Sequence, residues 1–232
     1  MRIADLNWMQ VEEYLGRDDR IVIPIGSTEQ HGYLSLATDV ILAERVSIEA
    51  AEPLGVAVLP VLPFGVAPGF LAYPGTVALE PDTLFLVLRD ALDSLHSQGF
   101  RRFLLVNGHG GNVGVEPRLA EWAHSHESAR VRFHSWYAGE RAVAAADATY
   151  ANATHANWFE NFPWTRLDGV TMPTGEKPMA AIDEERGDPA RIREILGDGT
   201  FGGAYERPDE EMLALWTVAV EEVRDLIEHG WG

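Results

Sequence analysis

The chain lacks cysteine altogether and contains a single lysine, Lys177. Without thiols it can form neither disulfide bonds nor thiolate–metal bonds, so any metal site must use carboxylate and imidazole ligands. The absence of cysteine also fits a reducing compartment, and we expect a cytoplasmic location. The 232 residues include 18 Lys+Arg against 36 Asp+Glu, which gives a formal net charge of −18. Because phosphate groups are bound by basic surfaces, this balance argues against nucleic acids and anionic membranes as partners.

Long hydrophobic runs are also missing. No apolar stretch approaches the roughly 18 residues of a membrane span, and residues 1–5 lack the basic and apolar regions of a secretory signal. With 46% hydrophobic residues, the chain is nevertheless too apolar to be disordered throughout. A chain of this length buries roughly 70% of its unfolded surface, so it needs no disulfide or metal in order to fold.

Short apolar segments alternate with longer segments of helical periodicity. The predicted strands are residues 21–25, 56–62, 103–106 and 131–136, and the predicted helices are residues 39–51, 81–97, 114–126, a segment ending near 148, and 208–229. This alternation predicts βαβ units and hence an α/β fold with a parallel, doubly wound sheet. The continuously apolar strands indicate that helices cover both faces. We expect residues 1–232 to form one domain, with an irregular segment at 150–188.

Two of the predicted strands are followed by side chains that can carry chemistry. Glu29 and His31 follow the first strand, and Asp39 comes eight residues after His31. His109 follows the third strand and lies between glycines that leave its imidazole accessible. Ligands bind at the carboxyl ends of the strands in open α/β sheets, so these residues are expected at one edge. Together they form a mixed nitrogen and oxygen ligand set that suits Zn, Mn or Fe, and an aspartate can bridge two ions.

Three of these four residues have a plainer interpretation when they are taken singly. Asp39 lies at the start of a predicted helix and could be its N-cap. His109 could be a loop histidine bonded to the backbone, and Glu29 could be a surface carboxylate. Their occurrence together at one predicted sheet edge favours a metal site over three separate explanations.

A third group of polar side chains lies within the irregular segment. In residues 154–164, His155 and Glu160 are candidates for acid–base catalysis or for a further metal ligand. Trp158, Phe159, Phe162 and Trp164 would form an apolar wall around them. Taken alone, this segment is more typical of an aromatic loop packed in the core around a satisfied histidine.

These motifs resemble those of the creatininase family of metal-dependent amidohydrolases. The first family signature is similar to residues 25–32 together with Thr38 and Asp39, and the second is similar to residues 107–112. The resemblance spans nearly the whole chain, with further similar segments at 64–65, 73–76, 155–160 and 199–203.

The resemblance implies a three-layer αβα sandwich, usually assembled as a homohexamer, with two divalent ions (Zn, Mn or Fe) in each subunit. Carried over by position, Glu29 and His109 would bind one ion and His31 the other. Asp39 would bridge the two ions. Metal-activated water would attack the carbonyl carbon of the substrate, and His155 would protonate the leaving group or stabilise the tetrahedral intermediate.

Three departures from the family pattern concern the second ion and the substrate. The family's glutamate ligand two residues after the metal histidine is Gly111 here, and Glu160 is the candidate to replace it. The serine of the substrate loop is Ala67. The glycine after the His-Ala pair is Asn157, and the residues after the following glutamate are changed at 161–162. Creatinine itself is therefore not the expected substrate.

The expected function is a metal-dependent hydrolase that opens a small cyclic substrate by cleaving a cyclic amide C–N bond. The alternative is hydrolytic C–C cleavage of an inositol-derived cyclic ketone, because residues 155–161 resemble a subgroup that includes a hydrolase of such inososes. A peptidase that trims short peptides is a further alternative within the family. A metal-free scaffold or sensor is the alternative from a different class of protein.

Overall fold

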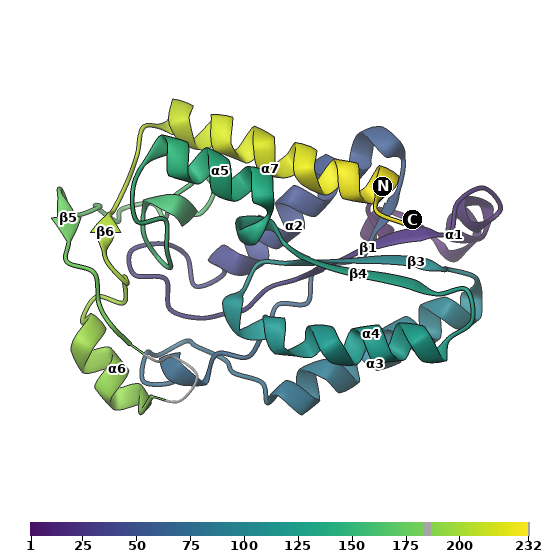
Figure 1. The fold of residues 1–232 in the computed structure, drawn as a ribbon, viewed down its shortest axis with the longest axis horizontal. Coiled ribbons are helices and arrows are strands. Elements are labelled where there is room, and N and C mark those ends of the chain that lie inside the picture. Colours follow the sequence, from purple (N-terminus) through teal and green to yellow (C-terminus); the bar gives the residue numbers. More distant parts are fainter. Residues whose placement is uncertain (183–186, 232) are drawn as a thin grey trace.

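The computed structural model describes residues 1–182 and 187–231. Its centre is a parallel sheet of four strands in the order β2-β1-β3-β4 (Figure 1). The strands are β1 (Arg20–Ile25), β2 (Ala57–Val58), β3 (Arg102–Asn107) and β4 (Arg130–Ser135). A small antiparallel pair, β5 (Glu176–Lys177) and β6 (Gly203–Ala204), lies apart from this sheet.

Helices cover both faces of the central sheet, as the apolar strands predict. Figure 1 shows α2, α5 and α7 on one side of the strands and α3 and α4 on the other. Alternate strand residues serve the two sides: Leu104 and Val106 pack in one core, whereas Phe103 and Leu105 pack in the other. The α-helices are α1 (Trp8–Leu15), α2 (Thr38–Ala51), α3 (Pro81–Gln98), α4 (Glu116–Ser125), α5 (Glu140–Thr149), α6 (Pro189–Leu196) and α7 (Asp209–His229). The predicted three-layer αβα fold with a parallel sheet is confirmed.

Short 3-10 turns connect many of these elements. They are η1 (Ile3–Asp5), η2 (Glu52–Leu54), η3 (Pro68–Phe70), η4 (Gly110–Val115), η5 (Trp136–Ala138) and η6 (Trp158–Glu160). No described helix is long and apolar enough to cross a membrane.

Several element boundaries differ from the predicted ones. The strand expected at 56–62 is reduced to Ala57–Val58, with an isolated bridge at Leu62, because Pro60 has no N–H to donate to a ladder. The helix expected from 114 begins with the 3-10 turn η4 and becomes α-helical at Glu116. The segment expected to be irregular is mostly loop, but it also contains η6 and β5, and its residues 183–186 lie outside the described part of the chain.

The sheet order reverses direction between β1 and β3. The chain passes from β1 to β2 on one side and later to β3 on the other, so the crevice outside their carboxyl ends is a topological switch point. The last residues of the two strands, Ile25 and Asn107, are directly paired. A Cβ atom at Gly108 would lie 2.4 Å from the Asp39 carbonyl oxygen, so glycine is required for the close approach of α2. The fold therefore brings three chain segments together at this edge.

Candidate metal centre

All four residues singled out at the strand ends meet in one buried cluster. Glu29 and His31 come from the loop after β1, Asp39 from the first turn of α2, and His109 from the turn after β3. Their exposed fractions are only 0–5%. The interpretation of Glu29 as a surface carboxylate is therefore wrong.

Asp39 is the centre of the cluster. Its Oδ1 lies 3.0 Å from His31 Nε2, and its Oδ2 lies 3.2 Å from His109 Nδ1. The N-cap of α2 is Ala37, and no side chain caps this end of the helix among the described residues. The interpretation of Asp39 as an N-cap is therefore wrong, and its two oxygens are instead directed at two different imidazoles.

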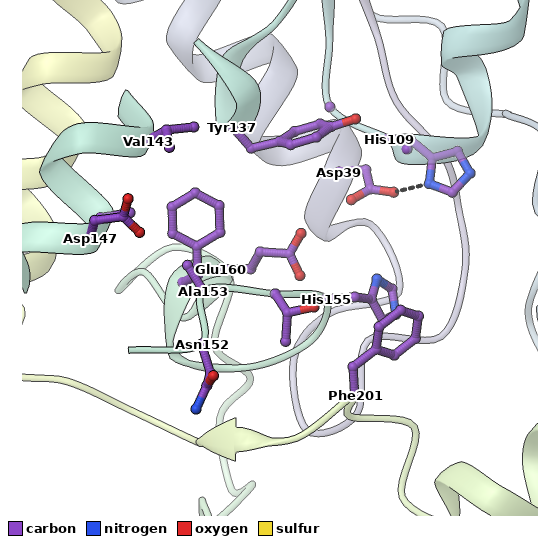
Figure 2. A pocket seen from close by; sticks show the side chains of 15 residues that line it. Asp39, His109, Tyr137, Val143, Asp147, Asn152, Ala153, His155, Glu160 and Phe201 are labelled. Carbon is purple, nitrogen blue, oxygen red and sulfur yellow. Dashed lines mark ion pairs between the residues drawn. The ribbon is translucent and has the colours of Figure 1, made fainter. Parts of the chain in front are cut away.

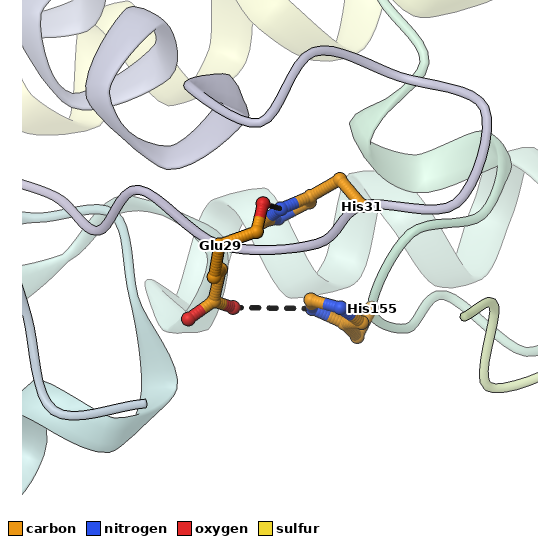
Figure 3. A group of neighbouring side chains, drawn as sticks. All are labelled: Glu29, His31 and His155. Atoms are coloured by element: carbon orange, nitrogen blue, oxygen red, sulfur yellow. Dashed lines mark hydrogen bonds and ion pairs between the residues drawn. The ribbon is translucent and has the colours of Figure 1, made fainter. Parts of the chain in front are cut away.

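Backbone carbonyls fix the ring orientation of both histidines. His109 Nε2 lies 2.8 Å from the Val66 carbonyl oxygen, and His31 Nδ1 lies 3.3 Å from that of Glu29 (Figure 3). A carbonyl only accepts hydrogen bonds, so in each ring this nitrogen carries the proton and the other nitrogen is free to coordinate a metal. Such a bond from the distal ring N–H is the usual support of metal-binding histidines. The interpretation of His109 as a backbone-bonded histidine thus holds for one nitrogen only.

The carboxylate of Glu29 also contacts His109. Its Oε1 lies 3.2 Å from His109 Nδ1, and its Oε2 accepts a hydrogen bond of 3.0 Å from Ser27 Oγ. Within the described residues, Glu29 Oε1, His31 Nε2 and Asp39 Oδ2 make no hydrogen bond, although each lies within 3.2 Å of a neighbouring nitrogen or oxygen. These atoms lie close together but are not aligned for hydrogen bonds with one another, which is the arrangement expected of ligands that face one metal ion.

The electric field of the cluster favours positive charge. Burial by itself disfavours a charged His31, but the carboxylates of Asp39 and Glu160 outweigh it and raise the pKa of His31 to about 10. The pKa of His109 is likewise raised, since the nearby Glu29 and Asp39 outweigh burial. The same two imidazoles overcome the effect of burial on Asp39 and keep its pKa below the usual range. The carboxylates that favour protons on these two rings would favour divalent cations at the same positions.

Glu160 joins the cluster from the segment after α5. Its Oε2 lies 3.6 Å from His31 Nε2 and accepts a hydrogen bond of 2.6 Å from the Ala156 N–H. Burial raises the pKa of Glu160 to about 7. Around it, Trp158 and Phe162 are fully buried in the core beside α7. The segment is therefore both the packed aromatic loop and the source of a site carboxylate.

His155 forms one wall of the site. Its ring stacks on Phe70 at 4.9 Å and lies 4.4 Å from the ring of His31. Figure 3 shows its Nδ1 directed at Glu29, where the separation from Oε1 is 3.8 Å. Burial, with the neighbouring His31, holds the pKa of His155 well below its usual range, so the ring is neutral.

These residues form three overlapping sets whose spacing would allow them to hold a metal ion. In each set, one ligand atom per residue lies within 4.8 Å of the others. The sets are Glu29, Asp39 and His109; His31, Asp39 and Glu160; and Glu29, His31 and His155. The donors are carboxylate oxygens and imidazole nitrogens, which suit Zn, Mn or Fe.

The structure also explains why position 111 carries no ligand. A Cβ atom at Gly111 would lie 1.9 Å from the Val66 carbonyl oxygen and 2.7 Å from His109 Nε2. Any side chain here would break the bond that orients His109. Glu160 reaches the cluster from a different segment and places a carboxylate beside His31.

A cavity of about 480 Å³ opens onto the cluster. Asp39, His109, His155 and Glu160 line it, and Figure 2 shows that Tyr137 lines it as well, with its hydroxyl on the side of Asp39 and His109. Sequence reasoning missed Tyr137, although it directly follows a predicted strand and the strand-end rule would have included it. A second cavity, of about 650 Å³, lies beside the loop at residues 66–71 and is also lined by His109 and Gly111.

Comparison with known proteins matches nearly the whole chain to one family. A family model for creatininase, described as creatinine amidohydrolase, matches residues 4–227. Creatinine amidohydrolase of Pseudomonas putida is 32% identical over 114 residues, which are 46% of this chain and only 44% of that protein. The 3-dehydro-scyllo-inosose hydrolase of Thermotoga maritima is 33% identical over an alignment of 253 positions, covering 94% of this chain and 81% of that protein.

A solved structure of creatininase with Mn has the same fold. It superposes with a TM-score of 0.83 at 25% sequence identity, covering 99% of this chain and 98% of the other. The resemblance predicted from the motifs is confirmed by these matches, and so is the prediction of an enzyme. The chain therefore belongs to the creatininase family of metal-dependent hydrolases.

Proposed function

We propose that the cluster binds two divalent ions bridged by Asp39. The first ion would also be held by Glu29 and His109, and the second by His31 and Glu160. The observation that carries this proposal is the position of Asp39, whose two oxygens face the ring nitrogens of two different imidazoles at 3.0 and 3.2 Å. The four residues after β1 and β3, with Glu160, thus act as one ligand set.

The chemistry we propose is hydrolysis at a carbonyl carbon. Divalent ions supply an activated water and polarise the carbonyl group. His155 lines the cavity beside this set and its ring is neutral, so it can exchange a proton with the tetrahedral intermediate or with the leaving group. Glu160 is also a candidate for acid–base catalysis, because its carboxylate lies 3.6 Å from His31 Nε2 and lines the cavity.

The proposed substrate is a small cyclic compound. A cavity of about 480 Å³ is of the size that encloses one small molecule. Our leading proposal is a cyclic amide opened at its C–N bond. The alternative, an inositol-derived cyclic ketone opened at a C–C bond, is supported by the polar cavity groups Tyr137, Asp147 and Thr154, which can bind hydroxyl groups. It is also supported by the similarity to the inosose hydrolase over 94% of the chain.

The first experiment measures metal content and turnover together. Purified protein supplied with Zn, Mn or Fe is assayed against a panel of lactams, inosose ketones and short peptides, and its metals are counted by mass spectrometry. We expect about two ions per chain and turnover of one cyclic class. A metal content near zero that added ions do not restore would contradict the proposal and favour a metal-free scaffold.

Two substitutions separate metal binding from chemistry. Glu160→Gln should reduce the metal stoichiometry towards one ion, because it removes a charged ligand of the second site. The matched control is Glu121→Gln on the exposed face of α4, which should leave the stoichiometry unchanged. His155→Ala should lower the rate far more than the metal content, and an equal loss of both would identify His155 as a ligand instead.

We also propose that residues 1–232 act as one domain, in a homohexamer located in the cytoplasm. The support is the match to one family over residues 4–227 and the family resemblance. Light scattering coupled to size exclusion should give six times the mass of the chain, and a monomer would contradict the assembly. Fractionation of the cells that produce the protein should place it in the soluble cytoplasmic fraction.

A further inference from the structure

Tyr137 is a polar cavity group that neither the metal ligands nor the family motifs include. It lies in η5 directly after β4, on the same sheet edge as the cluster, and lines the cavity with Asp39 and His109. In Figure 2 its hydroxyl is on the side of Asp39 and His109, while His155 lies on the other side of the cavity. A substrate above the cluster would therefore lie between a phenol and an imidazole.

The hydrogen bonds around Tyr137 leave its proton available. The side chain of Asn107 has a fixed orientation, because its Oδ1 accepts from the His109 N–H and its Nδ2 donates to the His109 carbonyl oxygen. The same Nδ2 lies 3.4 Å from Tyr137 Oη, so the phenolic oxygen is the acceptor in this contact. Burial raises the pKa of Tyr137, whereas the hydrogen bond from the Ser135 side chain lowers it, as a bond donated to the phenolic oxygen does. Ser135 Oγ itself accepts from the same Asn107 Nδ2 at 3.0 Å. The O–H group is therefore free to point into the cavity.

The cavity also has a need for such a donor. No lysine or arginine is among the described residues that line it. When water adds to a carbonyl carbon, the new C–O bond forms as the carbonyl π electrons move onto the oxygen, and that negative charge needs hydrogen-bond donors. Gly110 has no side chain between Tyr137 and the cluster: even a Cβ atom there would be 3.9 Å from Tyr137 Oη.

We propose that Tyr137 is a catalytic residue that donates its phenolic hydrogen bond to the substrate carbonyl oxygen and to the oxyanion formed as water adds. The proton stays on the tyrosine, so no charge or atom is transferred in this step. The inference rests on the proposed function, and it adds to that function an oxyanion donor from a third strand end.

The test compares Tyr137→Phe with Tyr14→Phe, a control in which the lost hydroxyl donates to the Arg20 carbonyl oxygen at the other end of β1. Binding of inorganic phosphate, a tetrahedral oxyanion, is measured by calorimetry on the metal-loaded proteins. We expect phosphate to bind about 10- to 100-fold more weakly to Tyr137→Phe, at unchanged metal content, and equally well to the control. On any substrate that the wild type hydrolyses, kcat should fall by roughly 10²- to 10³-fold with little change in KM.

The outcomes distinguish this inference from the proposed function. Equal phosphate affinity in wild type and Tyr137→Phe would overturn the role of Tyr137, and so would a metal-loaded wild type that binds no phosphate. If phosphate binding depends on Tyr137 but no compound of the panel is hydrolysed, the donor is supported and the proposed substrates are wrong.

Discussion

Position 111 offers a test of how this chain supplies its carboxylates. If alignment with the family were sufficient, Gly111→Glu would restore the missing ligand and strengthen metal binding. The structure predicts the opposite, because the Cβ atom alone would lie 1.9 Å from the Val66 carbonyl oxygen and 2.7 Å from His109 Nε2. Both Gly111→Glu and the milder Gly111→Ala should therefore displace His109 and lose metal.

The size of the effect follows from the contacts. Relieving the overlap requires the loop at Val66 to move by more than 1 Å, and overpacking of this kind costs about 1–3 kcal/mol. The bond from His109 Nε2 to the Val66 carbonyl, 2.8 Å long, is lost as well, which adds about 1 kcal/mol. The free energy of unfolding of Gly111→Ala should fall by about 2–4 kcal/mol, which corresponds to a midpoint lower by roughly 5–15 °C for a chain of this size.

The assay is thermal unfolding followed by circular dichroism, with and without added Zn or Mn, combined with metal counting. The matched control is Gly114→Ala in the same 3-10 turn, where a Cβ atom meets nothing within 4 Å. The control should be neutral or slightly stabilised, since alanine restricts the unfolded chain more than glycine does. The reasoning is refuted if Gly111→Ala unfolds like the control, or if Gly111→Glu gains metal.

Three further outcomes are expected. Removing the ions with a chelator should lower the free energy of unfolding by about 2.7 kcal/mol for ions present at 100 times their dissociation constant, and so lower the unfolding midpoint. If the cluster held no ions, the midpoint measured by calorimetry would be the same with and without the chelator. Lys177→Met should lower the free energy of unfolding, measured by urea titration, by about 2 kcal/mol. The reason is that the ammonium group donates to the carbonyls of Leu196 and Thr200 and pairs with Asp198. Burial raises the pKa of Tyr14 to about 12 in the folded protein, against 10 in the unfolded chain. The resulting contribution to the free energy of unfolding is complete below pH 10 and is lost as the pH rises through 12. Tyr14→Phe, measured in the same urea titration, should therefore lose less stability than the wild type over this range of pH.

The part of the site that follows parallel strands could be predicted from the sequence. The carboxyl ends of adjacent parallel strands meet at one edge, so residues directly after β1 and β3 had to lie together. Glu29, His31 and His109 are such residues, and their residue types alone indicate possible metal ligands. Asp39 belongs to the same group only because α2 approaches the strand ends closely over Gly108, which is a tertiary contact.

What could not be predicted depends on contacts between distant segments. The ring of His155 stacks on Phe70 from a loop 85 positions earlier, and no local pattern encodes that meeting. The obstruction at Gly111 is caused by a backbone carbonyl of Val66, which has no signature in the sequence. The short helices α1 and α6 were missed because eight residues give few turns of periodicity.

The distances in the cluster fit metal ions better than they fit protons. Ligands that bind one ion at about 2.0–2.2 Å with angles of 90–110° lie about 2.8–3.6 Å apart. The separations from Asp39 to His31 and His109, and from His109 to Glu29, are 3.0, 3.2 and 3.2 Å. A proton can satisfy only one nitrogen–oxygen pair at a time, and the second ring nitrogen of each histidine is already committed to a backbone carbonyl. A divalent ion held by these residues would be bonded by several of the facing atoms together, which would remove the cost of the unpaired buried atoms that protons leave behind.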